Sequence, residues 1–116
     1  MEKSEYSVLK IYASSTDKIG MKLLYEYIVE LAKEQGLAGA TVYRGMMGFG
    51  QSSNKISSSR FWELTEKLPV MIELMDRTAV LEAFFQAIEP DLQQMQKGCL
   101  VSMEPVRIML MKPGKR

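Results

Sequence analysis

Apolar residues recur along this 116-residue chain with two different spacings, and each spacing predicts a different type of element. The β-type run 7–13 is followed by the polar stretch 14–17, which predicts a first strand and its end. Apolar side chains then recur every three or four residues, as on one face of a helix, at Met21, Leu24, Ile28 and Leu31. We expect Thr16 or Asp17 to cap this helix and Gly36 to end it.

Two further strands and a second helix follow from the same patterns. Residues 39–47 predict a second strand, and residues 61–75, which Pro69 interrupts, predict a third strand that forms a long hairpin with the second. Asp76 or Thr78 is expected to cap the second helix. The apolar stripe of this helix consists of Leu81, Phe84, Phe85, Ile88, Leu92 and Met95.

Prolines and a glycine divide the last part of the chain. Pro90 is expected to kink the second helix or to restart it as a new first turn, and Gly98 is expected to end it. Pro105 separates two β-type runs, 99–104 and 106–111. We expect the second run to leave the sheet edge or to pair with another chain.

The order of strand, helix, two strands, helix and strand predicts the α+β class: a ferredoxin-like βαββαβ sandwich with an extra C-terminal strand. The length and the 47% hydrophobic content predict a single domain over residues 1–116. The run 70–75 is apolar on both alternating faces apart from Glu73, so we expect other copies to cover the sheet face opposite the helices. Three copies around a threefold axis would bury these faces and place clefts between subunits near the hairpin loops.

Composition narrows the choice of partner and compartment. With 15 basic and 14 acidic residues the net charge is +1, which argues against nucleic acid as a partner. Cys99 is the only cysteine, so the chain has no intramolecular disulfide, and we expect a cytoplasmic protein. The charged segment 1–7 lacks the apolar region of a signal peptide, and no apolar run approaches the roughly 20 residues that cross a bilayer, so we expect a soluble chain.

The sequence contains no histidine, which removes the usual proton shuttle and the Ser/His/Asp and Cys/His nucleophilic systems. Cys99 begins an apolar run and is interpreted as a small core residue. The ten methionines, including the pairs Met46 with Met47 and Met109 with Met111, fit core or interface positions better than a soft-metal site. We therefore expect a binding protein and not an enzyme, with no metal and no cofactor.

The glycine-rich stretch that precedes the serine-rich loop is the strongest candidate for a ligand site. Gly45, Gly48 and Gly50 allow backbone conformations in which successive N–H groups point together toward an anion. Lys55 and Arg60 follow in the serine-rich loop and would add positive charge. Taken alone, these residues fit a simple hairpin connection with solvated cations equally well.

Five short motifs are spread over nearly the whole chain: Leu-Tyr-Glu at 24–26, Gly-Leu-Ala-Gly-Ala-Thr-Val at 36–42, Gly-Phe-Gly at 48–50, Leu-Pro-Val-Met-Ile-Glu at 68–73 and Gly-Cys-Leu-Val at 98–101. Through these motifs the chain resembles the PII-like superfamily, and more narrowly its group named domain of unknown function 190. The resemblance implies a homotrimer with a ligand, an adenine nucleotide in PII proteins, bound between subunits. The loop after the second strand would be the counterpart of the PII T-loop and would report on that ligand.

Carried over residue by residue, the resemblance implies that one wall of the ligand cleft consists of Thr41, Gly48, Phe49, Gly50 and Gln51. Positive charge would come from Lys97 and Arg107, with Lys112 as a weaker candidate. Arg44 is kept as a candidate, although an arginine in a strand more readily forms an ion pair. The chain departs from the PII pattern because no tyrosine lies between Gly50 and Arg60, so nucleotidylation has no acceptor there.

We therefore interpret the chain as a signalling or regulatory protein. A small anionic ligand at the intersubunit clefts would change the loop 49–60, which would control a membrane transporter or an enzyme. Members of the group are sometimes associated with fluoride-channel homologues, so an ion channel is a further candidate partner. Two alternatives stay open: a structural trimer that scaffolds a partner through Phe61 and Trp62, and an enzyme acting on a phosphorylated or carboxylate metabolite with Lys55, Arg60 or Glu63 in its cleft.

Overall fold

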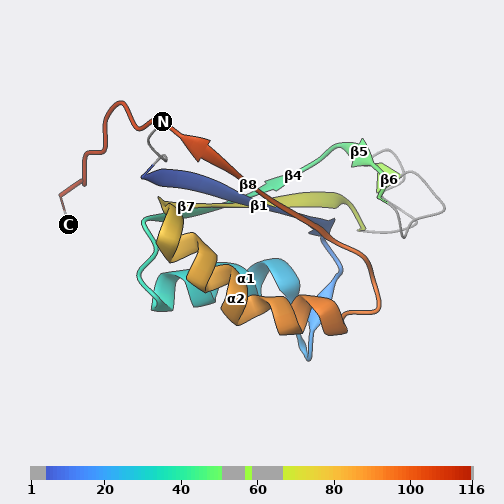
Figure 1. Ribbon diagram of the computed structural model, residues 1–116. Helices are drawn as coiled ribbons and strands as arrows, with labels where there is room; N and C mark the ends of the chain where they lie inside the picture. The colour runs from blue at the N-terminus through green and yellow to red at the C-terminus, as the bar shows by residue number, and fades with distance from the viewer. Residues whose placement is uncertain (1–4, 51–56, 59–66, 116) are drawn as a thin grey trace.

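The computed structural model describes residues 5–50, 57–58 and 67–115, which form a two-layer α+β sandwich (Figure 1). One layer is a four-stranded antiparallel sheet in the order β4-β7-β1-β8, and both helices lie on one of its faces. The main elements are β1 (Tyr6–Ser14), α1 (Leu24–Glu34), β4 (Gly39–Arg44), β7 (Pro69–Arg77), α2 (Thr78–Gln94) and β8 (Leu100–Val106). Two short ribbons pair β2 (Lys18–Ile19) with β3 (Lys22–Leu23), and β5 (Met47–Gly48) with β6 (Ser57–Ser58). The predicted ferredoxin-like arrangement is confirmed.

The core lies between the helices and the inner face of the sheet. β1 pairs with β7 along its whole length, from Tyr6 opposite Arg77 to Ser14 opposite Pro69. Alternate side chains of these central strands meet the apolar stripes of the helices, and the largest fully buried ones are Phe84, Ile11, Leu24, Ile28, Ile72, Leu74, Leu81 and Ile88. Burial of each such side chain stabilises the fold by about 1.5–3 kcal/mol relative to exposure.

The first helix begins later than its apolar spacing predicts. Met21 is 96% exposed in the turn between β2 and β3, and α1 starts at Leu24. The expected caps Thr16 and Asp17 are wrong, because the Asp17 carboxylate accepts a hydrogen bond from the Ser14 N–H at 2.9 Å instead. The Asp17 backbone carbonyl accepts the N–H of Leu24 at 2.7 Å, so this residue holds the entry to the helix through its main chain.

The end of α1 follows the prediction. Gly36 has a positive φ of 76°. Its N–H donates to the Lys33 carbonyl at 3.1 Å, and the Leu37 N–H donates to the Ala32 carbonyl at 3.0 Å. This pair of bonds is a Schellman motif, which favours glycine because a residue with a Cβ is strained at such a φ.

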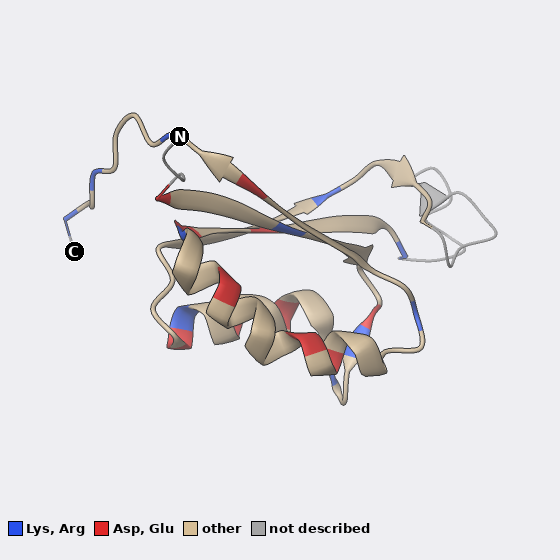
Figure 2. Cartoon of the chain, in the orientation of Figure 1, with Lys and Arg blue, Asp and Glu red and all other residues tan. Residues whose placement is uncertain are grey.

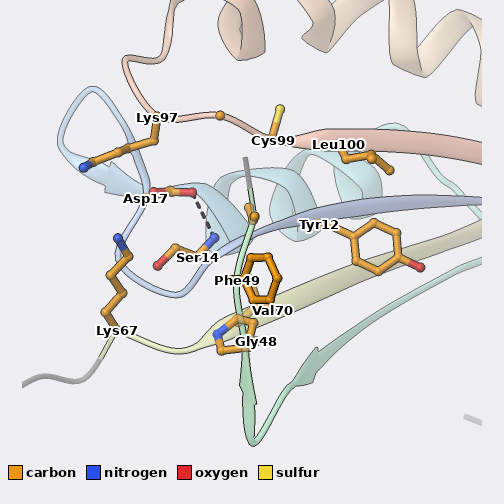
Figure 3. A pocket seen from close by; sticks show the side chains of 14 residues that line it. Tyr12, Ser14, Asp17, Gly48, Phe49, Lys67, Val70, Lys97, Cys99 and Leu100 are labelled. Carbon is orange, nitrogen blue, oxygen red and sulfur yellow. Dashed lines mark hydrogen bonds between the residues drawn. The ribbon is translucent and has the colours of Figure 1, made fainter. Parts of the chain in front are cut away.

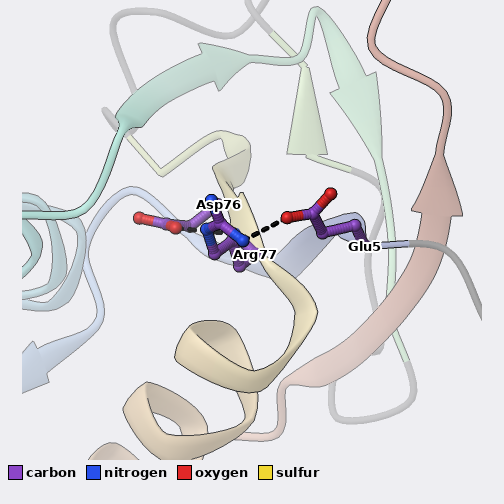
Figure 4. A network of polar contacts seen from close by, with 3 residues as sticks. All are labelled: Glu5, Asp76 and Arg77. Atoms are coloured by element: carbon purple, nitrogen blue, oxygen red, sulfur yellow. Dashed lines mark hydrogen bonds and ion pairs between the residues drawn. The ribbon is translucent and has the colours of Figure 1, made fainter.

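The start of α2 also differs from the prediction (Figure 4). No described side chain caps this helix, because the Asp76 carboxylate accepts the adjacent Arg77 N–H at 2.6 Å and the Thr78 hydroxyl bonds the Ser7 hydroxyl at 2.6 Å. The Arg77 guanidinium pairs with the Glu5 carboxylate. These side chains join the start of β1 to the junction between β7 and α2.

Prolines occupy positions where the fold tolerates them. Pro90 lies inside α2, which does not restart there but continues to Gln94 and ends before Gly98. Pro69 begins β7 instead of interrupting a strand, and Pro105 lies within β8 at the edge of the sheet. Proline is accepted at a strand start and on an edge strand because its missing N–H leaves no ladder bond unmade there.

The chain leaves the sheet after Val106. Residues 107–115, all of which are described, contain no helix or strand and extend away from the sandwich (Figure 1). The predicted extra C-terminal strand is therefore not formed in the single chain, because a strand needs a neighbour to satisfy its backbone hydrogen bonds. Met109 and Leu110 are each 80% exposed in this tail.

β4 and β7 pair as the predicted hairpin, with Arg44 opposite Val70. The predicted strand 39–47 is nevertheless divided, because the chain turns at Gly45 and continues as β5, which pairs with β6. The Gly45 N–H donates to the Pro69 carbonyl at 2.7 Å at this turn. Residues 61–66 of the predicted third strand lie outside the described residues.

The sheet face opposite the helices mixes apolar and charged side chains. Tyr12, Tyr43 and Leu100 share this face and are 42%, 49% and 57% exposed. The Lys10 ammonium lies 2.7 Å from the Glu104 carboxylate, and the hydrogen bond and the charge of that carboxylate raise the pKa of Lys10. Such a half-solvated apolar face can accept a protein partner.

Candidate functional site

A cleft of about 660 Å³ opens at one end of the sheet (Figure 3). One wall is the glycine arm, which we define as residues 45–50, after the end of β4; of these, residues 48–50 line the cleft. The end of β1, the start of β7 and the turn 97–100, which includes the first residue of β8, line it as well. The sheet order therefore brings together four segments that lie far apart in the sequence.

Backbone hydrogen bonds fix the wall at the start of β7. The Ser15 N–H donates to the Leu68 carbonyl at 2.8 Å, and the Leu68 N–H donates to the Ser15 hydroxyl at 2.9 Å. This reciprocal pair ties the residue next to Lys67 to the turn that follows β1. The same turn is closed by Asp17, whose N–H donates to the Ser14 carbonyl at 3.1 Å.

The cleft is charged at one end and aromatic toward the other. Lys67, Lys97 and Asp17 lie at the charged end, and the rings of Phe49 and Tyr12 lie toward the opposite end (Figure 3). Among the described residues that line the cleft, two lysines and one aspartate give a formal charge of +1. Such a site favours a ligand that joins an anionic group to a flat apolar ring.

The helical layer has the opposite charge balance (Figure 2). The sequence of α2 contains Glu82, Glu89 and Asp91 and neither lysine nor arginine. Acidic residues also outnumber the single lysine of α1. Because like charges repel, an anionic ligand is disfavoured along the helices and favoured at the lysine end of the cleft.

Cys99 lies on the cleft wall and is exposed, so its interpretation as a core residue is wrong. Desolvation by neighbouring atoms raises the pKa of its thiol, and the Asp17 carboxylate adds to the rise. The thiol therefore stays protonated near neutral pH. A protonated thiol is a poor nucleophile, and the surroundings of Cys99 do not activate it for covalent chemistry.

Four of the predicted site residues meet in this cleft: Gly48, Phe49, Gly50 and Lys97. Three others, Gln51, Lys55 and Arg60, lie outside the described residues.

The remaining four predicted residues do not line the cleft of the single chain. Thr41 lies on β4 opposite Glu73, and Arg44 ends that strand. Arg107 and Lys112 lie in the tail beyond β8. These four could reach a ligand only if another copy of the chain brought them there.

Two observations concern metal sites and membrane spans. Within residues 5–50, 57–58 and 67–115, no group of three or more His, Cys, Asp or Glu side chains is arranged to hold a metal ion. Neither helix in the described part of the chain has the length and apolar character that a bilayer span requires.

Comparison with known proteins places the chain in a family. The sequence pattern of the family DUF190, described as "Uncharacterized ACR", matches residues 6–108. The chain belongs to DUF190. One relative of this DUF190 chain is the "UPF0166 protein" of Aquifex aeolicus (strain VF5), which is 34% identical over 82 residues, 71% of this chain and 77% of that protein. A UPF0166 protein of Methanocaldococcus jannaschii is 38% identical over 69 residues, 60% of this chain and 62% of that protein.

A solved structure shows the same fold. The DUF190 chain superimposes on CPII from Thiomonas intermedia K12, a structure bound to ADP and bicarbonate, with a TM-score of 0.52. The match covers 90% of this chain and 93% of that one, at 13% sequence identity. This similarity is one of fold, and the family match confirms the predicted resemblance to DUF190.

Sequence reasoning missed several cleft residues of the DUF190 chain. Asp17 was expected to cap a helix and Cys99 to fill the core, although both line the cleft. Tyr12 and Lys67 carried no motif, because they enter the cleft only through the pairing of β1 with β7. The tight polar stretch 14–17 was the one available signal, since it marks the end of a central strand.

Proposed function

We propose that this chain is a PII-like regulatory protein that binds a small anionic ligand in the cleft between the glycine arm and the turn 97–100. The observation that carries the proposal is the convergence of Gly48 and Gly50 with Lys67 and Lys97 around one space. Ammonium groups recognise phosphate or carboxylate oxygens as point charges. The expected anion-binding glycine turn is not formed, because neither Gly48 nor Gly50 has a positive φ, so the two lysines carry the recognition.

An adenine nucleotide is the ligand that fits this chemistry best. Its phosphates would lie at the lysine end, and its base would pack against Phe49 or Tyr12, whose rings can stack on a flat heterocycle. CPII, the structural neighbour, was solved with ADP and bicarbonate. ADP is therefore the first probe for this chain, and bicarbonate the second.

We further propose that three copies assemble through the sheet faces opposite the helices. Tyr12, Tyr43 and Leu100 would lose their exposure there, and the apolar tail residues Met109 and Leu110 would find a neighbour. The clefts would then lie between subunits, where tail cations of an adjacent copy could reach them. Sedimentation equilibrium should give the mass of three chains, and a monomer at micromolar concentration would refute this part.

In the regulatory proposal, the ligand selects one arrangement of the loop 49–60, and that loop controls a transporter, an ion channel or an enzyme in the cytoplasm. Ordering a residue costs about 1–2 kcal/mol of backbone entropy, so the ligand must make several new contacts to shift the loop. We propose that the chain acts as a binding protein and not as an enzyme.

Calorimetric titration tests the ligand proposal. ADP, ATP, cyclic AMP and bicarbonate are added to the wild type, Lys67→Ala, Lys97→Ala and the control Lys33→Ala, whose lysine lies in the last turn of α1. We expect at least one nucleotide to bind and each cleft variant to weaken it by about tenfold, because a charge-assisted hydrogen bond is lost. A nucleotide affinity that is unchanged in both Lys67→Ala and Lys97→Ala would refute the site. If none of the four probes bound, a scaffolding trimer would become the preferred function.

A further inference from the structure

The glycine arm turns against a single proline. A Cβ atom built on Gly45 would lie 2.9 Å from Cγ of Pro69, a separation that real Cβ atoms do not show. A Cβ on Gly48 would lie 3.4 Å from the same atom. The Gly45 N–H also donates to the Pro69 carbonyl at 2.7 Å. The arm therefore runs too close to Pro69 at Gly45 for a Cβ atom, and one hydrogen bond links the two residues there; at Gly48 a Cβ atom would make an ordinary van der Waals contact.

Backbone conformation does not explain the glycine at position 45. In the described part of the chain, the glycines with positive φ are Gly20 and Gly36. The φ of Gly45 is accessible to alanine, and among the described residues the closest obstacle to a side chain is the Pro69 ring. Glycine is therefore favoured at position 45 by the short distance to Pro69 and not by its φ.

Pro69 is itself held in place and faces the ligand cleft. Its neighbour Leu68 is bonded in both directions to Ser15, at 2.8 and 2.9 Å, and Pro69 starts β7 opposite Ser14. Pro69 also lines the cleft together with Gly48. One fixed ring thus contacts the arm on one side and the ligand space on the other.

We propose that Pro69 is the pivot that sets the position of residues 48–50 against the cleft, and that Gly45 is a positioning residue because its missing side chain permits this contact. The proposal rests on the ligand function proposed above but concerns the arm's placement. Adding one methyl group at position 45 would push the arm away from Pro69 and carry Gly48 and Gly50 off the anion site. The same methyl group at Gly39, the first residue of β4, would meet no atom of the described residues within 4 Å.

The test is a steric suppression experiment on the full chain. Gly45→Ala, the control Gly39→Ala and the double variant Gly45→Ala/Pro69→Ala are compared by amide NMR spectra without ligand and by calorimetric titration with ADP. We expect Gly45→Ala to shift the amide signals of residues 48–50 and to weaken ADP binding by about tenfold, the usual scale of an overpacked contact. Gly39→Ala should change neither. In the double variant the methyl group added at position 45 should take up the space of the lost ring, so the arm should return to its position and both readouts should recover, because Cγ is the clashing atom.

Two results would overturn the pivot. One is a Gly45→Ala protein whose signals at residues 48–50 and ADP affinity equal those of the wild type. The other is a double variant whose amide signals and ADP affinity equal those of Gly45→Ala, because the effect of Gly45→Ala would then not depend on Pro69. If Gly45→Ala does not fold, the double variant decides. A folded double variant with wild-type signals at residues 48–50 would support the contact with Pro69, and one that fails to fold or has shifted signals there would refute it. If the wild type does not bind ADP, a probe that does bind among ATP, cyclic AMP and bicarbonate replaces it in the titration. If none of the four binds, the ligand function fails while the ligand-free spectra still decide the pivot.

Discussion

Replacing Pro90 by alanine should stabilise the protein, because the proline lies inside a helix that continues past it. α2 runs from Thr78 to Gln94, and Pro90 is exposed on its surface. A proline in a helix interior removes the hydrogen bond to the carbonyl four residues earlier, here that of Gln86, and its ring crowds that carbonyl. Alanine would supply the N–H and remove the ring.

The size of the gain follows from two opposing contributions. Proline is about 3 kcal/mol less favourable than alanine within a helix. Alanine leaves the unfolded chain freer, which subtracts about 0.4–1 kcal/mol, and the position close to the C-terminal end of α2 reduces the gain further. We expect a net stabilisation of about 1–2 kcal/mol. For a chain of 116 residues the unfolding entropy converts this to a rise in Tm of about 4–8 °C.

The assay is urea unfolding followed by circular dichroism at one fixed protein concentration, with calorimetry for Tm. Gln86→Ala is the control, because it changes an exposed side chain one turn earlier and leaves the backbone bonds as they are. An unchanged or lower free energy of unfolding for Pro90→Ala would refute the reasoning. It would mean that the helix is distorted at Pro90 so that no carbonyl is crowded.

Three further outcomes follow from the described contacts. Tyr27→Phe should lower the free energy of unfolding by about 1 kcal/mol at pH 7, since the Tyr27 hydroxyl donates to the Asp91 carboxylate at 2.8 Å. That hydrogen bond, burial and the charge of Asp91 raise the pKa of Tyr27, so the difference from wild type in pH-dependent unfolding should be complete below pH 10 and shrink as the pH rises through the folded pKa. Iodoacetamide should alkylate Cys99 more slowly at pH 7.5 than it alkylates a free thiol, and bound ADP should slow the reaction again; mass spectrometry measures both rates. Ile72→Ala should lower the free energy of unfolding in urea by about 2–5 kcal/mol, because Ile72 is fully buried. Met71→Ala, on the opposite face of the sheet, should lower it clearly less, and equal decreases would contradict the assignment of faces.

The sequence predicted the sheet and both helical stripes because these depend on local periodicity. Leu24 and Ile28 on α1, and Phe84 and Ile88 on α2, are buried as their spacing requires. The helix starts could not be predicted in the same way. Asp17 is a plausible cap by its residue type, but its carboxylate closes the turn after β1, a choice that depends on tertiary structure.

The candidate site was predictable only where a motif marks it. The glycines at 48–50 and Lys97 lie next to recognisable motifs, and they share the cleft. Lys67 and Tyr12 lie there because β7 pairs with β1, which no local pattern reveals. The close approach of Gly45 to Pro69 likewise depends on how two distant segments pack, which the sequence alone does not reveal.

The most direct test of the account is a crystal structure of the protein grown with ADP. The account predicts density for the nucleotide between residues 48–50 and the turn 97–100, with its phosphates within hydrogen-bond distance of the Lys67 and Lys97 ammonium groups. A nucleotide bound at another surface, or a cleft that stays empty in crystals grown at a concentration of ADP that saturates the protein in solution, would contradict it.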